Sequence, residues 1–420
     1  MQLPARQAGL GRPAPSLMIS PDEIVAALVS GPWHEAPMRT RVTLRAGVLL
    51  EPSWVGQLVP AVLGAFPSAP PTAELAAFLS GWRPVAELPD VAALARLLDV
   101  DDGELAWFAD LRSWERRAAA PLRHYRWWTM PKRGGRRLVA APKPRLKEIQ
   151  RRLLRHVIAP IATHAAAHGC EPGRSVRSAL QPHVASTVVV RADLESFFAS
   201  IAAVRVAGVL RWAGLPDDVA HTVTGLCTTV VPFEVWRSVP RPADRDAHFR
   251  LGRHLATPHL PVGAPTSPAL ANLVAFALDR RLSGLAAAFE GRYTRYVDDL
   301  IFSGGVDLRA GRARFVRRLG EIVTDEGFRL VPAKTVVLGA AGRQQLLGAV
   351  VNDHPTLPRR DRDNLRALLH NCVVHGPASQ ARGRANFRPH LLGRIAAVAA
   401  LDPPLGARLR AQFDAIDWSQ

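Results

Sequence analysis

The sequence predicts an α+β fold, in which a few short strands form an antiparallel sheet that is packed among many helices. β-branched or apolar runs of strand length occur at Thr187–Ala192 and on both sides of Asp298 within Arg292–Ser303. Helical patterns occupy Pro268–Leu282 and much of residues 359–420. The two kinds of pattern together predict a fold of the mixed class.

The first 120 residues are expected to form a small, mainly helical accessory region. Proline interrupts the helical patterns at several places between residues 60 and 89. The acidic stretch Asp99–Asp102 precedes Leu105 and Trp107, which is typical of a helix that begins with an acidic first turn. This region contains no residues that indicate a chemical reaction.

The pattern changes at Tyr125. Residues 125–142 predict two strands joined at Gly134 and Gly135, which gives a hairpin with a basic tip. Lys143–Ile158 then follows as a basic amphipathic helix. The sequence therefore predicts a hairpin and a helix ahead of the strand at Thr187–Ala192.

The composition excludes several classes of protein. Of the 420 residues, 48% are hydrophobic and 21% are charged, which is typical of a globular chain and not of a disordered one. Apolar runs fall far short of the roughly 18 residues that a membrane span needs, so no membrane partner is expected. The three cysteines are widely spaced, which fits neither a disulfide scaffold nor a zinc site and indicates a cytoplasmic protein.

The positive charge is concentrated in the last 300 residues. The formal net charge is +18, yet residues 1–120 contain 10 Arg and 13 Asp or Glu. Residues 121–420 contain 44 Lys or Arg and 23 Asp or Glu. A region this basic indicates a polyanion such as a nucleic acid as its partner, although an arginine-rich composition could have the same effect.

Three carboxylates stand in apolar strand contexts. Asp193 ends the strand that begins at Thr187, and Asp298 and Asp299 interrupt the second apolar region. Buried carboxylates without partners are costly, and adjacent like charges more so. Divalent cations remove that cost, because Mg²⁺ prefers hard oxygen ligands and bridges carboxylates to phosphates. A turn or a helix cap is the alternative for an Asp-Asp pair.

Several segments resemble the boxes of the reverse transcriptase family. Tyr296–Asp299 resembles its Tyr-x-Asp-Asp box, and Asp193–Phe198 resembles the box with the first metal-binding aspartate. Leu260–Asn272 lies between them and resembles the loop and helix that support template and nucleotide. Pro131–Val139 resembles the fingers hairpin, and Gly327–Lys334 resembles the later palm segment with its lysine. Boxes in this order and spacing identify the chain as a member of this family over roughly residues 121–420.

Within the family the chain resembles the bacterial retron-type enzymes. His168–Val176 and Leu392–Leu401 fit that group. Three positions depart from its pattern. Ala179-Leu180 stands where retron enzymes carry Asn-Ala, Leu346-Leu347-Gly348 replaces Val-Thr-Gly, and Val262 replaces a glutamine.

The resemblance implies the architecture of a right-hand polymerase. Fingers are expected at residues 121–187, a palm with an antiparallel sheet and helices at 188–350, and a helical thumb at 351–420. The accessory region at residues 1–120 would precede them. Basic thumb helices would follow the backbone of a nucleic acid duplex and read its shape.

The resemblance also implies the metal site. Asp193, Asp298 and Asp299 would bind two Mg²⁺ ions with help from the Leu194 carbonyl, and Mn²⁺ is the alternative ion. These residues would catalyse nucleotidyl transfer from dNTPs onto a primer hydroxyl.

The remaining site residues are expected to act on the incoming nucleotide. Lys132 and Arg137 would bind its triphosphate, and Phe198 would exclude a 2′-hydroxyl. Gly263 would let the backbone approach the nucleotide. Lys334 would protonate the leaving pyrophosphate, a role that suits lysine because arginine cannot release a proton.

The expected function is therefore RNA-directed DNA polymerisation by a retron-type enzyme. Its partners would be a structured non-coding RNA, which is template and primer through a 3′- or 2′-hydroxyl, the cDNA product, and a separate effector protein in anti-phage defence. Two alternatives stay open. One is a non-retron defence-associated reverse transcriptase with a different template or no fixed one, and the other is a catalytically idle RNA-binding scaffold.

Overall fold

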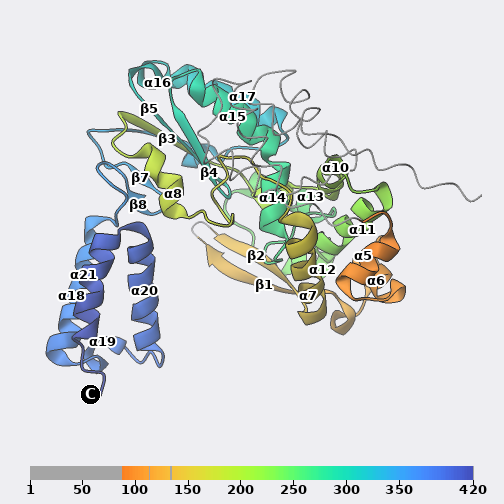
Figure 1. The fold of residues 1–420 in the computed structure, drawn as a ribbon, viewed down its shortest axis with the longest axis horizontal. Coiled ribbons are helices and arrows are strands. Elements are labelled where there is room, and N and C mark those ends of the chain that lie inside the picture. Colours follow the sequence, from red (N-terminus) through yellow and green to blue (C-terminus); the bar gives the residue numbers. More distant parts are fainter. Residues whose placement is uncertain (1–87, 113, 133–134, 420) are drawn as a thin grey trace, which may run out of the picture.

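The computed structural model describes residues 88–420 apart from residues 113, 133–134 and 420 (Figure 1). The expectations for residues 1–87 lie outside this range. Within it, α5 (Val91–Leu98) begins at Asp90, whose side chain accepts a hydrogen bond from the Ala93 N–H. Asp101 caps α6 (Asp102–Ala109) in the same way. The helix start predicted near Asp99–Asp102 is therefore confirmed.

The predicted sheet is present, with four antiparallel strands in the order β4-β5-β3-β6 (Figure 1). The strands are β3 (Val188–Asp193), β4 (Arg292–Tyr296), β5 (Asp299–Gly304) and β6 (Val336–Gly339). The three strands that the sequence predicted around Asp193, Asp298 and Asp299 are adjacent in this sheet. Strand β3 lies in the interior of the sheet, which explains why both of its faces are apolar.

The two faces of the sheet have different neighbours. Helices α15 (Phe276–Ala287) and α17 (Arg312–Asp325) cover one face. There the ring of Phe302 on β5 stacks on Tyr293 at 4.7 Å and meets Phe315 of α17 edge-on at 5.0 Å. Because side chains alternate along a strand, Asp193 points to the other face, together with Val189.

One predicted helix is divided in two. The sequence predicted a single helix over Pro268–Leu282, whereas α14 (Ser267–Val274) and α15, which begins at Phe276, are separated at Ala275. The break contains neither proline nor glycine, so the sequence gives no signal that predicts it. Both helices contribute buried polar groups to the end of the sheet.

The predicted hairpin is confirmed as β1 (Tyr125–Lys132) paired with β2 (Gly135–Pro142), and its tip at residues 133–134 is outside the described range. Helix α7 (Pro144–Leu153) follows, and its last part continues as a π-helical turn at Leu154–Ile158. Helices α5 and α6 share one hydrophobic core with α7. Arg145 of α7 also pairs with Glu104 of α6, so the described end of the N-terminal region is bound to the helix after the hairpin.

A further group of helices lies between the end of β3 and α14. Helix α11 packs against α6 and α10, and Trp236 of α12 stacks on His248 of α13 at 4.3 Å. Their bounds are α9 (Phe197–Ser200), α10 (Ala203–Trp212), α11 (Asp217–Cys227), α12 (Phe233–Ser238) and α13 (Arg245–Leu255).

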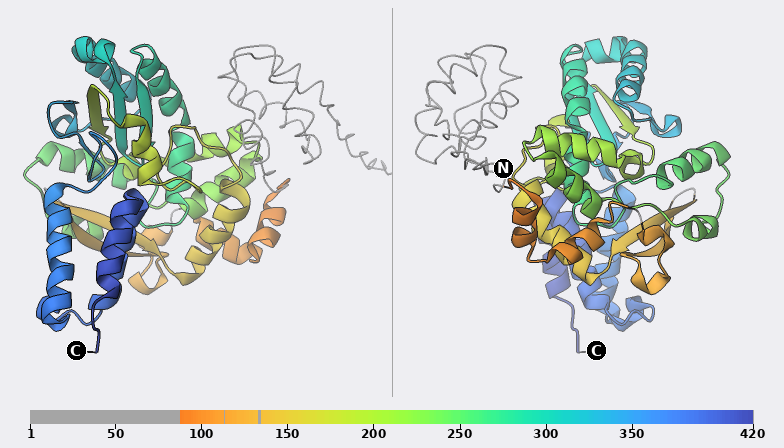
Figure 2. Two further views of the ribbon diagram at one scale, coloured as in Figure 1. Left: turned by 60° about the vertical axis from the view of Figure 1, so that its left-hand side comes forward. Right: turned by 90° about the vertical axis from the view of Figure 1, so that its right-hand side faces the viewer.

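The C-terminal helices form a bundle with its own hydrophobic core, at one end of the molecule (Figures 1 and 2). Its members are α18 (Arg359–His375), α19 (Ala378–Ala381), α20 (Phe387–Leu401) and α21 (Pro403–Asp414). Leu401 joins a smaller cluster that includes Val189 of β3 and Leu346, which connects the bundle to the sheet. The helices predicted in residues 359–420 are thus present.

Short elements complete the described chain. They are α8 (Val176–Leu180), α16 (Val306–Ala310), β7 (Gln345–Leu346), β8 (Ala349–Val350) and the 3₁₀ turns at Glu115–Arg117, Ala120–Leu122, Gln181–His183 and Pro332–Lys334. From residue 88 onward, the helices are too short or too polar to cross a membrane. All three cysteines are free thiols.

Candidate active site

Two of the predicted carboxylates face each other across the sheet. Asp193 is the last residue of β3 and Asp299 the first of β5, and the two form a directly opposed pair in the antiparallel register. Opposed residues of this kind lie about 4.5–5.5 Å apart at their Cα atoms, with both side chains on the same face. The carboxylates therefore share the face that α15 and α17 leave uncovered.

Asp298 lies in the two-residue turn that joins β4 and β5, because Tyr296 pairs with Asp299. The other turn residue, Val297, has a φ of +59°. A β-branched residue rarely adopts this conformation, which costs on the order of 1–3 kcal/mol and persists only where the surroundings enforce it. The Leu194 N–H donates to the Asp298 carbonyl at 2.9 Å, which binds the turn to the chain after β3.

Burial and mutual repulsion disfavour ionisation of the carboxylates in the Asp-Asp pair. Burial, and then the charge of Asp193, raises the pKa of Asp298 above its ordinary range. Burial, followed by the charges of Asp298 and Asp193, raises the pKa of Asp299 to about 6. Shifts of this sign mean that the site favours positive charge at this position.

Lys334 supplies one such charge. Its Nζ lies 2.6 Å from Asp193 Oδ2, with the lysine side chain 55% exposed and the aspartate side chain 10% exposed. The 3₁₀ turn at Pro332–Lys334 places it there, and the Val331 N–H donates to the Asp193 carbonyl. The structure thus brings Lys334 together with the predicted metal-binding residues.

No group of three His, Cys, Asp or Glu side chains in the described part of the chain is arranged as a ready-made metal site. The three aspartates nevertheless offer the hard oxygen donors that Mg²⁺ prefers. The raised pKa values of two of them fit an ion that would neutralise their charge.

The hairpin β1–β2 carries the two predicted phosphate-binding residues. Lys132 ends β1 and Arg137 lies on β2 opposite Met130, and both side chains are exposed. The charge of Arg137 lowers the pKa of Asp298, against the larger effect of burial. The charge of Arg137 therefore acts on the Asp-Asp turn in the same direction as that of Lys334.

Gly263 connects the hairpin to the loop before α14. Its φ is +123°, and a Cβ at this position would lie 2.9 Å from the Ala140 carbonyl oxygen of β2. The Ala140 N–H donates to the Val262 carbonyl at 2.8 Å. The close approach in the structure is therefore to the hairpin backbone, while the predicted approach to a nucleotide stays a prediction.

Phe197 and Phe198 are adjacent in α9, the short helix after Asp193, and they differ in burial. Phe197 is buried and its ring lies 5.6 Å from that of Phe328, whereas Phe198 is only partly buried. The exclusion of a 2′-hydroxyl by Phe198 stays a prediction, as does the metal contact of the Leu194 carbonyl.

Sequence reasoning missed a buried polar network behind the turn. Arg295 on β4 is fully buried and pairs with Asp279 of α15, which is also fully buried. Asn272 of α14 accepts a further hydrogen bond from Arg295. The signal that was available is the alternation of the strand, which places Arg295 on the same face as the aromatic Tyr293.

Comparison with known proteins agrees with this geometry. A family model described as "Reverse transcriptase (RNA-dependent DNA polymerase)" matches residues 130–351, which include the facing aspartates, the Asp-Asp turn and the sheet. The chain therefore belongs to the reverse transcriptase family, and it is an RNA-directed DNA polymerase.

The relatives place it among the retron-type members. The retron Mx65 reverse transcriptase of Myxococcus xanthus is 37% identical over 345 residues, which cover 81% of this chain and 74% of the relative. The retron Mx162 reverse transcriptase of the same organism is 35% identical over 346 residues, with 79% and 68% covered. The retron Ec86 reverse transcriptase of Escherichia coli is 26% identical over 289 residues, with 68% and 79% covered. The resemblance to retron enzymes is thus confirmed despite the altered positions Ala179 and Leu180.

Proposed function

We propose that this enzyme copies a structured non-coding RNA into DNA by two-metal nucleotidyl transfer at Asp193, Asp298 and Asp299. The observation that carries the proposal is the opposed pair Asp193 and Asp299, with Asp298 in the adjoining turn. In this assignment residues 121–187 are the fingers, 188–350 the palm and 351–420 the thumb.

The three aspartates and the Leu194 carbonyl would hold two Mg²⁺ ions, or Mn²⁺ in their place. Such ions, when bound, activate the attacking hydroxyl and neutralise charge on the leaving oxygen. The protein's own contribution is to hold the carboxylates on two adjacent strands and on a turn whose backbone is bound to the chain after β3.

The nucleotide would lie between this site and the hairpin. Lys132 and Arg137 would bind the triphosphate, and Phe198 would select deoxyribose. The charge of Arg137 lowers the pKa of Asp298, which supports a place for this arginine near the site. Lys334 would exchange its contact with Asp193 for the leaving pyrophosphate and donate its proton there. Gly263 would keep the loop before α14 close to the hairpin.

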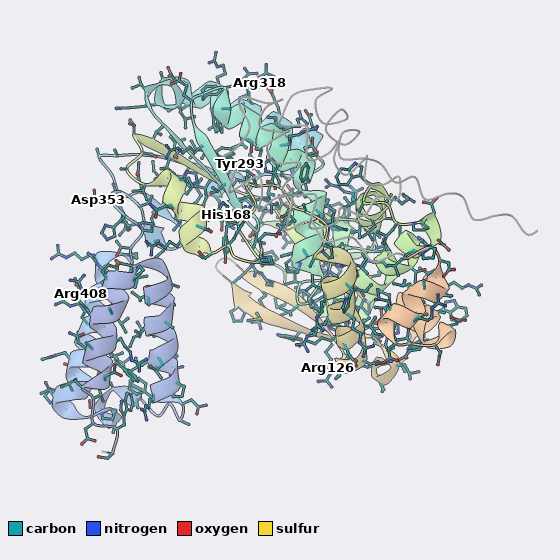
Figure 3. All side chains as sticks on the ribbon, viewed as in Figure 1. Arg126, His168, Tyr293, Arg318, Asp353 and Arg408 are labelled. Carbon is teal, nitrogen blue, oxygen red and sulfur yellow. The ribbon has the colours of Figure 1, made fainter. Side chains whose placement is uncertain are left out.

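The RNA would be held in part by the C-terminal bundle. A cavity of about 420 Å³ between α18 and α21 is lined by Arg359, Arg362, Arg366 and Arg408, with Asp363 as its acidic member. Arg408 lies on this bundle (Figure 3). Arginine binds phosphate oxygens in bidentate geometry, so this arrangement suits a nucleic acid backbone.

The relatives' names include the word retron, and this supports an RNA that serves as both primer and template. The cDNA would grow from a 3′-hydroxyl or from a 2′-hydroxyl of that RNA. We also propose that the enzyme acts in anti-phage defence together with a separate effector protein.

Primer extension on an RNA template tests the catalytic assignment. The wild type should incorporate dNTPs only with Mg²⁺ or Mn²⁺ present. Asp298→Asn should lose at least about a thousandfold in rate, which corresponds to about 4 kcal/mol of transition-state stabilisation.

The matched control is Asp307→Asn, which changes a first-turn carboxylate of α16. It should keep the wild-type rate. An Asp298→Asn enzyme that extends primers at the wild-type rate would refute the two-metal assignment.

A further inference from the structure

We infer that Arg295 is a positioning residue for polymerisation: it fixes the Val297-Asp298 turn through a hydrogen bond to the Val297 carbonyl, and Asp279 and Asn272 hold its guanidinium in place. The inference rests on the proposed two-metal site, because the turn it concerns carries Asp298. Arg295 is a buried charge, and the proposed metal-binding carboxylates alone give no reason for its presence.

Four of the five N–H donors of the Arg295 guanidinium have directional partners. Its Nε donates to Asp279 Oδ1 at 2.8 Å and its Nη2 to Asp279 Oδ2 at 2.6 Å. Its Nη1 donates to Asn272 Oδ1 at 2.9 Å and to the Val297 carbonyl at 3.0 Å. Asp279 binds the Nε and Nη2 edge of the planar guanidinium. This contact fixes the direction in which the Nη1 group points toward the turn.

The partners of Arg295 are themselves held. Tyr293, which lies in the sheet region (Figure 3), donates its hydroxyl to Asp279 Oδ1 at 2.8 Å. Asn272 donates its Nδ2–H groups to the Gly169 carbonyl at 2.9 Å and to Glu171 Oε1 at 2.7 Å. The network therefore joins α14, α15, β4 and the loop at residues 168–171.

That loop supports the turn from a second side. The His168 N–H donates to the Arg295 carbonyl at 2.8 Å. At Gly169 a Cβ would lie 2.6 Å from the Val297 N and 2.7 Å from its Cγ2. Val297 is thus enclosed by the loop and bound through its carbonyl by Arg295, which accounts for the retention of a φ of +59° at a β-branched residue.

A buried ion pair alone would not require this arrangement. An ion pair needs Asp279 and a cation, and a lysine ammonium would satisfy it. The contacts to Asn272 and Val297 need a planar fork with donors on both of its edges. Arg295→Lys therefore separates the two roles, since it keeps the charge and loses the contact to the turn.

The test compares Arg295→Lys with Arg281→Lys. Arg281 lies on α15, the helix that carries Asp279, and pairs with Asp325 and Glu326, but its side chain is 36% exposed. Direct Mn²⁺ binding, measured by electron paramagnetic resonance without nucleotide, should weaken about 10–100-fold in Arg295→Lys and stay unchanged in Arg281→Lys. The kcat of primer extension should fall with it, while the KM for dNTP should change little.

A second variant covers the possibility that Arg295→Lys unfolds. The double variant Arg295→Leu/Asp279→Leu removes both charges, so neither is left unpaired in the core and the protein can still fold. No donor then remains for the Val297 carbonyl. This double variant should show the same loss of Mn²⁺ binding.

The outcomes are distinguishable. Wild-type Mn²⁺ binding in Arg295→Lys or in the folded double variant, beside weak binding in Asp298→Asn, would overturn the positioning role alone. Equal binding in wild type and Asp298→Asn would overturn the two-metal site, and this inference with it.

Discussion

Two cation–carboxylate pairs lie at the same end of the sheet, and they differ in burial and in partners. Arg295 and Asp279 are both 0% exposed, and two hydrogen bonds join them. The side chains of Lys334 and Asp193 are 55% and 10% exposed, and one contact of 2.6 Å joins them.

The difference separates a structural pair from an exchangeable one. A buried pair cannot lose one member without leaving an uncompensated charge in the interior. An exposed lysine on a flexible side chain can leave its partner at little cost, because water replaces the contact. The first pair holds the turn, and the second would release Asp193 for the metal ion proposed above.

The largest expected effect comes from breaking the buried pair. Arg295→Leu should lower the free energy of unfolding by about 3–5 kcal/mol, because Asp279 is then buried without a partner. Lys334→Leu should change it by no more than about 1 kcal/mol. Urea denaturation of the two variants measures both quantities.

The double variant Arg295→Leu/Asp279→Leu sharpens this comparison. It should recover most of the stability that Arg295→Leu loses, since neither charge remains. Losses of equal size for Arg295→Leu and Lys334→Leu would contradict the distinction between the two pairs.

A smaller effect is expected when the turn is displaced from the loop side. Gly169→Ala would place a Cβ 2.6 Å from the Val297 N, so the backbone must shift. The cost should be about 1–3 kcal/mol of stability. Polymerase activity should also fall, because the shift moves the Asp298 turn.

Gly208→Ala is the matched control, because a Cβ at this position of α10 meets nothing within 4 Å. It should leave activity unchanged and stabilise the helix slightly. Equal activity of both alanine variants would show that the turn tolerates displacement.

The smallest expected effect concerns a buried group that is neutral, in contrast to Arg295. His183 is 0% exposed and is bonded to Ser303 Oγ and Thr294 Oγ1, each at 2.8 Å. Burial lowers the pKa of His183 to about 3. In the unfolded chain the His183 imidazole binds a proton near pH 6.5, whereas in the folded chain it stays neutral. The free energy of unfolding therefore falls as the pH falls below this value.

His183 should thus contribute a loss of about 1 kcal/mol between pH 7 and pH 5.5. Unfolding free energies of the wild type and His183→Gln over this interval measure the contribution, which should be absent in the variant. His390→Gln, on an exposed position of α20, should keep the wild-type slope. A slope that His183→Gln leaves unaltered would contradict the assignment.

The sequence predicts the strands next to Asp193, Asp298 and Asp299 because these follow from local patterns. Asp193 and Asp299 each stand next to an apolar strand, and the two-residue interval at Val297-Asp298 is short enough to require a hairpin. The pairing of distant strands could be expected only through the family boxes, since apolar patterns do not specify which strands are neighbours.

The network around Arg295 was not predictable in the same way. Asn272, Asp279 and Arg295 lie on three different elements, and each residue alone is typical of a solvated position. The break between α14 and α15 at Ala275 likewise has no proline or glycine that would predict it. Such features depend on tertiary packing, which a single sequence does not display.

We propose that the enzyme uses its facing aspartates to copy one particular RNA into DNA. Sequencing of the nucleic acid that copurifies with the protein, with and without RNase, tests it most directly beside an Asp298→Ala/Asp299→Ala control. We expect one short cDNA joined to one RNA in the wild type and no cDNA in the control. Heterogeneous DNA that requires the aspartates would contradict the fixed template, and RNA alone in equal amounts from both proteins would contradict the polymerase.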